Sequence, residues 1–211
     1  MTSRPGPRRR LHGDDGAVIV ELALVAPFLV LLVLGVFEFG NVYRDKTLLA
    51  GALRSAGRTA SQSGKINKAD QVALTSFYAT ASKLKNVVLQ KVIIYKTTAS
   101  GGPPPASCLS ASTLGTAPYG VAGLCNVYSG AQVSSAAAGL AAFNYGSGVN
   151  GTCTAANWDF NWCWNTRVLT PATADYLGVY AEYTYTGITT IMPVRTITLS
   201  DYAVYRMEPD V

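Results

Sequence analysis

The hydrophobic positions of the chain divide it into one long apolar block and a mostly polar remainder. From Ala17 to Gly40 the only charged residues are Glu21 and Glu38, one near each end. A helix in the core of a soluble protein has a polar face, and this block has none. At a rise of about 1.5 Å per residue, the block is long enough to cross the roughly 30 Å hydrocarbon core of a bilayer. The pattern predicts a transmembrane helix over residues 17–40.

Beyond the block, apolar residues first recur at helical spacing and later alternate as they do in strands. The first helix is expected to continue to about Ser63, and residues 68–86 have the spacing of a second, amphipathic helix. Strand-like segments follow at 87–95, 178–186 and 194–207. Helices first and strands later predict an α+β domain, in which the second helix packs on a three- to four-stranded antiparallel sheet.

Residues 97–175 differ from the segments on either side. A Gly-Gly-Pro-Pro-Pro breaker at 101–105 opens a stretch that is rich in Ser, Ala, Gly, Thr and Asn, with one short helix expected over 131–143. We interpret this stretch as a loop-rich insertion. The predicted organisation is a leader over 1–16, a transmembrane helix over 17–40 and an outer domain over 41–211 that contains the insertion.

All four cysteines lie inside that insertion, at Cys108, Cys125, Cys153 and Cys163. An even number of cysteines on one side of a membrane span favours two disulfides in an oxidising compartment. Three pairings are open, and short loops favour pairing each cysteine with its neighbour in the sequence. The rival interpretation is a zinc site, which needs C-x-x-C pairs or nearby histidines. The only histidine is His12, on the far side of the apolar block, so no metal ligand set is predicted.

The distribution of charge predicts how the apolar helix is oriented in the membrane. The net charge is +5, but charged residues make up only 14% of the chain, and the one basic cluster is Arg8-Arg9-Arg10. A cluster just before an apolar block is typical of a topology signal, and nucleic-acid binding has little support. The positive-inside rule places the N-terminus in the cytoplasm, although Arg44 and Lys46 weaken the contrast. A cleaved secretory signal fits less well, because the apolar run is too long and no small-residue site ends it.

Glu21 is the unexpected residue of the block. A charge in the bilayer core costs about 2.5–3.5 kcal/mol on insertion scales, so this carboxylate needs a partner or a position near the interface. One interpretation is that Glu21 lies near the cytoplasmic interface and extends toward it. The residues around Glu21 favour a second interpretation.

A basic, polar leader ends in Gly16, the apolar helix starts at Ala17, and Glu21 is its fifth residue. This arrangement resembles the cleavage signal of type IV pilins and pseudopilins. Residues 20–27 read VELALVAP and residues 34–43 read LGVFEFGNVY. These motifs resemble, more narrowly, the TadE-like pseudopilins of tight-adherence (Tad/Flp) pilus systems. The resemblance covers about residues 13–60.

The resemblance implies a function and its partners. A prepilin peptidase cuts between Gly16 and Ala17, and the apolar helix becomes the mature N-terminus. The carboxylate of Glu21 pairs with the new α-amino group of Ala17 on a neighbouring subunit. Pro27 is interpreted either as a hinge or kink used when the subunit leaves the bilayer, or as a tolerated membrane proline. The implied partners are membrane lipid, the peptidase, other Tad pilins or pseudopilins and the assembly platform, with the chain in the bacterial cytoplasmic membrane or in the pilus.

One rival function starts from residues of the outer domain. Trp158, Trp162 and Trp164 lie close together, and they form either a small satellite core around Cys163, which we favour, or an exposed surface for a partner. The second reading gives an alternative function, a membrane-anchored, adhesin-like binding module. An enzyme is not expected, because the sequence has no catalytic histidine arrangement, phosphate-binding loop or dinucleotide fingerprint, and no cofactor is predicted.

Overall fold

The structure is a computed structural model that describes residues 14–98, 100–113, 119–139, 153, 157–189 and 196–208. The chain divides into two compact units, Met1–Gly40 and Asn41–Val211, which are treated separately below. In chain order the elements are α1 (Asp14–Ser63), α2 (Ala69–Ala81), β1 (Val87–Thr97), α3 (Ala106–Ser110), β2 (Gly120–Val121), β3 (Cys125–Ser129), α4 (Gly130–Ala137), the 3-10 helix η2 (Trp164–Thr166), β4 (Tyr176–Thr186) and β5 (Thr196–Arg206). Residues 1–13 of the predicted leader lie outside the described residues, as does the end of the short helix expected over 131–143.

Helix α1 confirms the long N-terminal helix. It ends at Ser63, as its spacing predicts, and Gly64 follows in the left-handed conformation with φ +47°. Glycine is common at this position because it has no Cβ to clash there. Within the outer domain, α1 buries a face of small and leucine side chains that ends at Ala60. Because alanines dominate that face, the helix backbone can approach the sheet closely.

The second helix is shorter than the predicted 68–86. Residues 82–86 form a turn instead, and Asn86 has φ 57°, a conformation incompatible with a continuing helix. Helix α4 begins with a capping box, in which the Ser129 hydroxyl accepts a hydrogen bond from the Gln132 backbone and the Gln132 side chain accepts one from Ser129.

The sheet has five antiparallel strands in the order β2-β3-β1-β4-β5. Strands β1, β4 and β5 confirm the three predicted segments. The sequence analysis expected three or four strands, and the structure adds β2 and β3 from inside the 97–175 segment. These two strands are short and lie among turn residues, so they do not show a long alternating pattern. The fold class, α+β with helices on an antiparallel sheet, is confirmed.

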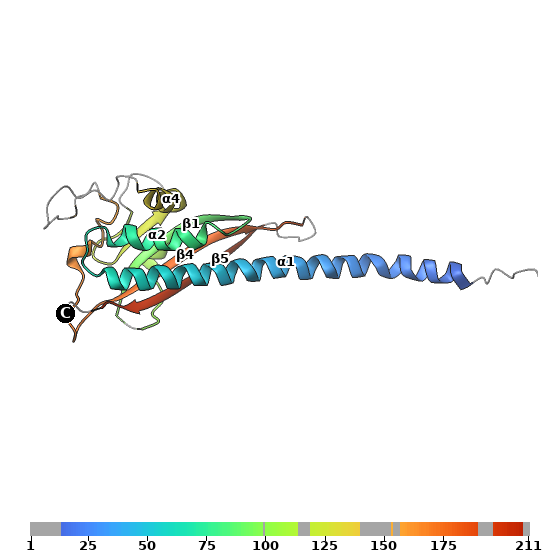
Figure 1. Cartoon of the computed structure of the whole chain (residues 1–211), viewed down its shortest axis with the longest axis horizontal. Coiled ribbons are helices and arrows are strands. Elements are labelled where there is room, and N and C mark those ends of the chain that lie inside the picture. Colours follow the sequence, from blue (N-terminus) through green and yellow to red (C-terminus); the bar gives the residue numbers. More distant parts are fainter. Residues whose placement is uncertain are drawn as a thin grey trace, which may run out of the picture. The chain divides into compact units, whose positions relative to one another are not determined.

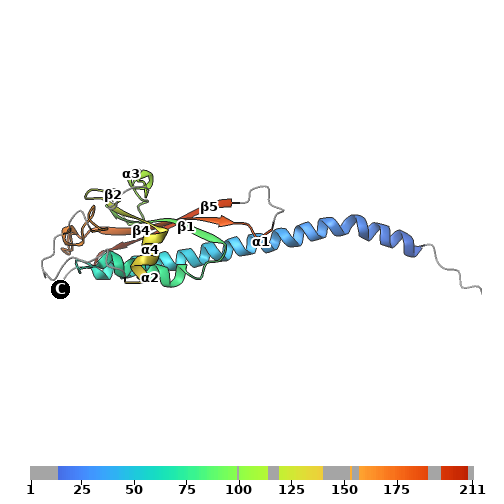
Figure 2. The same cartoon turned by 90° about the horizontal axis from the view of Figure 1, so that it is seen from above.

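In the outer domain, α2 and the second half of α1 cover one face of the sheet (Figures 1 and 2). The main core lies between these helices and strands β1 and β4. A smaller core on the other face joins β1, β3 and α3. Gly57 of α1 permits close packing, because a Cβ there would lie 2.6 Å from the ring of Tyr205. Gly178 has the same role on β4, where the ring of Tyr95 covers it.

Candidate functional site

The N-terminal part of α1 presents apolar side chains around its whole circumference. Gly16–Ser63 is the one helix among the described residues that is long and apolar enough to cross a membrane, and none of its most apolar window, of mean hydropathy 2.9, is buried. The exposed large apolar residues before Gly40 are Val18, Ile19, Val20, Leu22, Leu24, Val25, Phe28, Leu29, Val30, Leu31, Leu32, Val33, Val36, Phe37 and Phe39. An apolar surface of this length is stable in hydrocarbon and not in water, so this helix is a candidate membrane span.

The predicted processing and assembly residues lie at the beginning of that helix. Gly16 and Ala17 are exposed in its first turn, and Glu21 is exposed one turn further on. The first four N–H groups of a helix have no partner within the helix, so this turn opens at low cost to enter a peptidase. Among the described residues, no hydrogen bond or ion pair holds the Glu21 carboxylate. Val18, Leu22 and Val25 line a shallow hollow around it.

Two further residues of this helix were singled out from the sequence. α1 continues through Pro27, so the helix tolerates the missing N–H, and the hinge stays a prediction. Glu38, the charged residue near the other end of the apolar block, is only 1% exposed.

The four cysteines form two disulfides, Cys108–Cys125 and Cys153–Cys163. This is the pairing that short loops favour. The first bond fastens α3 to the beginning of β3, and both of its cysteines are fully buried. The cysteines are therefore structural, and the zinc interpretation is wrong.

The three tryptophans do not form the exposed surface that was considered. Trp162 is 2% exposed and belongs to the main core, whereas Trp164 is 8% exposed and packs beside Cys163 in a small separate core. Trp158 is half-buried against the main core. The favoured interpretation, a satellite core around Cys163, holds for Trp164. The partner surface is wrong, because the fold uses these rings to fill its interior.

A buried ion pair that the sequence analysis missed lies beneath the tryptophans. Asp70 in the first turn of α2 pairs with the guanidinium of Arg167, and both side chains are 0% exposed. The other Asp70 oxygen accepts hydrogen bonds from Asn126 Nδ2 at 2.8 Å and from the Tyr128 hydroxyl at 2.6 Å. Arg167 also lies 4.5 Å from the ring centroid of Trp162. Two neutral donors and one cation thus compensate a carboxylate that has no access to water.

Asn126 extends this arrangement to the tryptophan segment. Its Oδ1 accepts from the Trp162 backbone N–H at 2.8 Å, and its Nδ2 donates to the Trp162 carbonyl at 3.0 Å. The amide thereby pairs with residue 162 as a neighbouring strand would. The cluster fixes α2, β3 and the 157–169 segment to one another. We interpret it as structural, because every group it presents is turned inward and shielded from solvent.

A second buried carboxylate lies on α1 in the outer domain. Asp45 is 3% exposed, and burial raises its pKa, while the neighbouring Arg44 partly opposes the shift. Burial, with the charges of Asp45 and Asp201, raises the pKa of Tyr183 to about 12. The Tyr183 hydroxyl has no hydrogen-bond partner within the described residues. Such a group stays protonated at physiological pH, so it offers no base.

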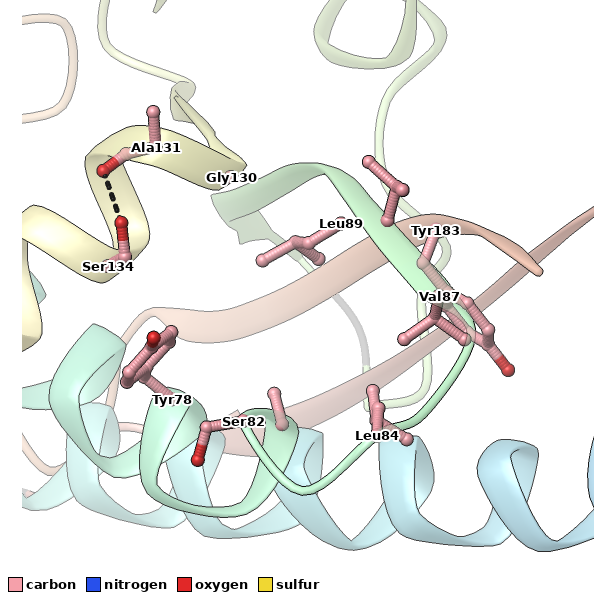
Figure 3. A pocket seen from close by; sticks show the side chains of 11 residues that line it. Tyr78, Ser82, Leu84, Val87, Leu89, Gly130, Ala131, Ser134 and Tyr183 are labelled. Atoms are coloured by element: carbon pink, nitrogen blue, oxygen red, sulfur yellow. Dashed lines mark hydrogen bonds between the residues drawn. The ribbon is translucent and has the colours of Figure 1, made fainter. Parts of the chain in front are cut away.

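A groove of the outer domain lies between the end of α2, the beginning of β1 and α4 (Figure 3). Its volume is about 430 Å³. Figure 3 shows aliphatic Leu84, Val87 and Leu89 on its walls, and the Ser134 hydroxyl donates to the Ala131 carbonyl at 2.9 Å. The groove has neither a carboxylate pair nor a histidine, and among the described residues no cluster of three or more potential metal ligands occurs. It offers no arrangement for catalysis.

Of the comparisons with known proteins, the one with family models gives a match, and it lies on the apolar helix and its continuation. Residues 16–58 match the family model described as TadE-like protein. Comparison with curated proteins and with solved structures gives no match. The matched segment begins at Gly16 and includes Ala17, Glu21 and Pro27. The family is structural rather than enzymatic, and it indicates a component associated with Tad pili and with other pilus proteins. Residues 16–58 of this chain are therefore similar to the TadE-like family.

Proposed function

We propose that this chain is a minor pilin or pseudopilin that acts in the biogenesis of a Tad-type pilus, and through it in surface adhesion. The observation that carries the proposal is the position of the family match. It begins at the predicted cleavage glycine and covers the apolar helix, whose large apolar side chains are exposed. A helix with this surface needs either lipid or other helices around it.

The first step is processing on the cytoplasmic side. A prepilin peptidase hydrolyses the Gly16–Ala17 peptide bond, which leaves a carboxylate on Gly16 and a free α-amino group on Ala17. The exposed first turn of α1 supports this, since its unpaired N–H groups make it the easiest part of the helix to unwind. The arginines at positions 8–10 keep this end in the cytoplasm, and the outer domain then faces the outside.

The second step is assembly. Glu21 pairs with the α-amino group of Ala17 on a neighbouring subunit, so that two charges that are each costly in hydrocarbon cancel. Pro27 loosens the helix about one turn beyond Glu21 and acts as a hinge when the subunit moves from the bilayer into the assembly.

The deciding experiment is mapping of the mature N-terminus in cells with an active prepilin peptidase. We expect the mature chain to begin at Ala17, and Gly16→Leu to leave the leader attached. Gly13→Leu is the matched control, since it changes a glycine of the same leader outside the cleavage site. A wild-type chain that retains Met1 in such cells, or a Gly16→Leu chain that is cut normally, contradicts the processing step.

A further inference from the structure

The turn between α2 and β1 lies at the end of the outer domain where the chain arrives from the apolar helix. Helix α2 follows α1 after a short turn and runs back beside it toward Asn41 (Figures 1 and 2), and the Ser55 and Ser76 hydroxyls lie 2.7 Å apart between the two helices. The first residues of β1 pair with the last of β4, and the Thr186 N–H donates to the Asn86 carbonyl at 2.8 Å. Figures 1 and 2 show this end of the sheet beside the same stretch of α1.

Several of the exposed side chains at this end are cationic, aromatic or aliphatic. We call them the basal surface, which comprises Tyr43, Arg44, Lys46, Lys83, Lys85 and Val88. Tyr43 is 75% exposed and Val88 is 60% exposed. Between residues 41 and 89 the only acidic residues are Asp45 and Asp70, and both are buried. The four cations therefore have no exposed carboxylate near them in this part of the sequence.

We propose that the basal surface binds the anionic headgroups of the outer leaflet and holds the outer domain against the membrane before assembly. This inference rests on the proposed anchorage of residues 17–40 in the membrane. Lysine and arginine attract anionic phosphates, and tyrosine places its ring at the level of the headgroups. The aliphatic side chain of Val88 adds apolar contact at the boundary with the acyl chains.

The distances of the cations from Asn41 distinguish two possible binding partners of the basal surface, lipid headgroups and an acidic protein. At about 1.5 Å per residue, Lys46 lies about 8 Å along α1 from Asn41, whereas Arg54 and Arg58 lie about 20 and 26 Å from it. The Debye length at physiological ionic strength is about 8 Å. Headgroups therefore act on Arg44 and Lys46, and on the turn that carries Lys83 and Lys85, but not on Arg54 and Arg58. An acidic protein docked along α1 would use the two distant arginines equally.

The test uses the full chain in nanodiscs of phosphatidylcholine, with or without phosphatidylglycerol. All four native cysteines are in disulfides, so Gln90→Cys supplies a single thiol for a fluorophore close to Val88. Ala172→Cys carries the control fluorophore at the opposite end of the sheet, near the end of β1. The readout is fluorescence quenching by lipids that carry a nitroxide on the headgroup.

We expect stronger quenching at position 90 in discs with phosphatidylglycerol than in discs without it, and no lipid dependence at position 172. Added salt should remove the difference. Lys83→Gln with Lys85→Gln should lower the ratio of docked to undocked domain about fivefold per lysine. Arg54→Gln with Arg58→Gln is the matched control and should change it little.

Three results overturn the inference. The first is equal quenching at position 90 in both lipid compositions. The second is an equal effect of the two charge-removing pairs, which would mean that the net charge of the outer domain, and not the basal surface, determines docking. The third is a chain that does not remain with the discs at all, and this result also contradicts the proposed anchorage. A chain that stays in the discs without lipid-dependent quenching contradicts the basal-surface inference alone.

Discussion

The apolar helix and the outer domain differ in whether the chain itself compensates the charge of a carboxylate. In the outer domain, Asp70 is fully buried, and the fold surrounds it with Arg167, Asn126 and Tyr128. In the apolar helix, Glu21 is exposed on an apolar surface, and no described residue of the same chain compensates it. The fold therefore supplies a cation and hydrogen-bond donors to the carboxylate in the outer domain, and supplies none to the carboxylate in the apolar helix among the described residues.

This difference shows which interactions stabilise each region. The outer domain is self-sufficient, with a core, a buried ion pair and two disulfides. The helix is not, because its apolar surface needs lipid or other helices and its carboxylate needs a cation from another molecule. Substitutions in the two regions should accordingly separate folding from assembly.

The largest expected effect is on assembly, from Glu21→Ala. This variant should be cleaved normally and keep the thermal stability of the outer domain, yet its incorporation into sheared pili should fall more than tenfold, because the Ala17 amine loses its partner. N-terminal mapping and immunoblotting of the sheared fraction measure the two steps. Val18→Ala on the same helix face is the control without a charge change. Normal incorporation of Glu21→Ala would show that this carboxylate has no role in assembly. Glu21 would then need no cation from another subunit, contrary to the comparison with Asp70.

The next effect is on folding, from Asp70→Asn. Removing one partner of a buried pair leaves the Arg167 charge uncompensated, so we expect a loss of about 3–5 kcal/mol in the free energy of unfolding. Chemical denaturation of the full chain in detergent, followed by near-UV circular dichroism, measures it. Glu208→Gln, at an exposed site, should have little effect. The double change Asp70→Leu with Arg167→Met should cost less than Asp70→Asn, and an equal or larger loss would mean that packing and not charge dominates.

The parts of the molecule set by local pattern were predictable from the sequence. The uninterrupted apolar run gives α1, richness in valine and isoleucine gives β1, and alternation gives β4 and β5. Short spacing gives the pairs Cys108–Cys125 and Cys153–Cys163. Each of these depends on residues close together in the chain. Glu21, Gly16 and Pro27 were found the same way, since their spacing within a dozen residues carries the family resemblance.

The parts set by long-range contact were not predictable. Asp70 and Arg167 are 97 residues apart, and nothing local to either indicates that they pair. In the sequence, Asp70 looks like a residue of a helix start, whereas the fold turns its carboxylate into the interior. Strand β3 was missed for a related reason, because its five residues become a strand by pairing with β1 on one side and β2 on the other. The tryptophans likewise show their role only once the core around them is formed.

A smaller effect should follow from removing the buried disulfide with Cys108→Ala and Cys125→Ala. The bond closes a loop across a sequence separation of 17 residues, and the loss of this constraint on the unfolded chain should cost about 3 kcal/mol. Differential scanning calorimetry in detergent measures the resulting decrease in Tm. Cleavage at Gly16 should be unaffected, which sharpens the separation between the two regions. A processing defect in this variant would show that the outer domain influences the helix more than we infer.

The smallest effect, and the only stabilising one, is expected from Asp45→Asn. Burial raises the pKa of Asp45 in the folded state, so folding favours its protonated form. The contribution of this group to stability is therefore greatest below the ordinary aspartate pKa of about 3.9, and it is lost as the pH rises through the raised folded value. At pH 7 the variant should be more stable than the wild type by no more than about 1 kcal/mol, or about 2–4 °C in Tm for a chain of this size. The difference should shrink as the pH falls toward 4, since the wild-type carboxyl is then protonated as well. Asp201→Asn, on strand β5, is the control for a general loss of negative charge. An Asp45→Asn variant that is less stable at pH 7 would mean that this carboxylate, like Asp70, is compensated by the fold, and the outer domain would then contain no uncompensated buried acid among those considered above.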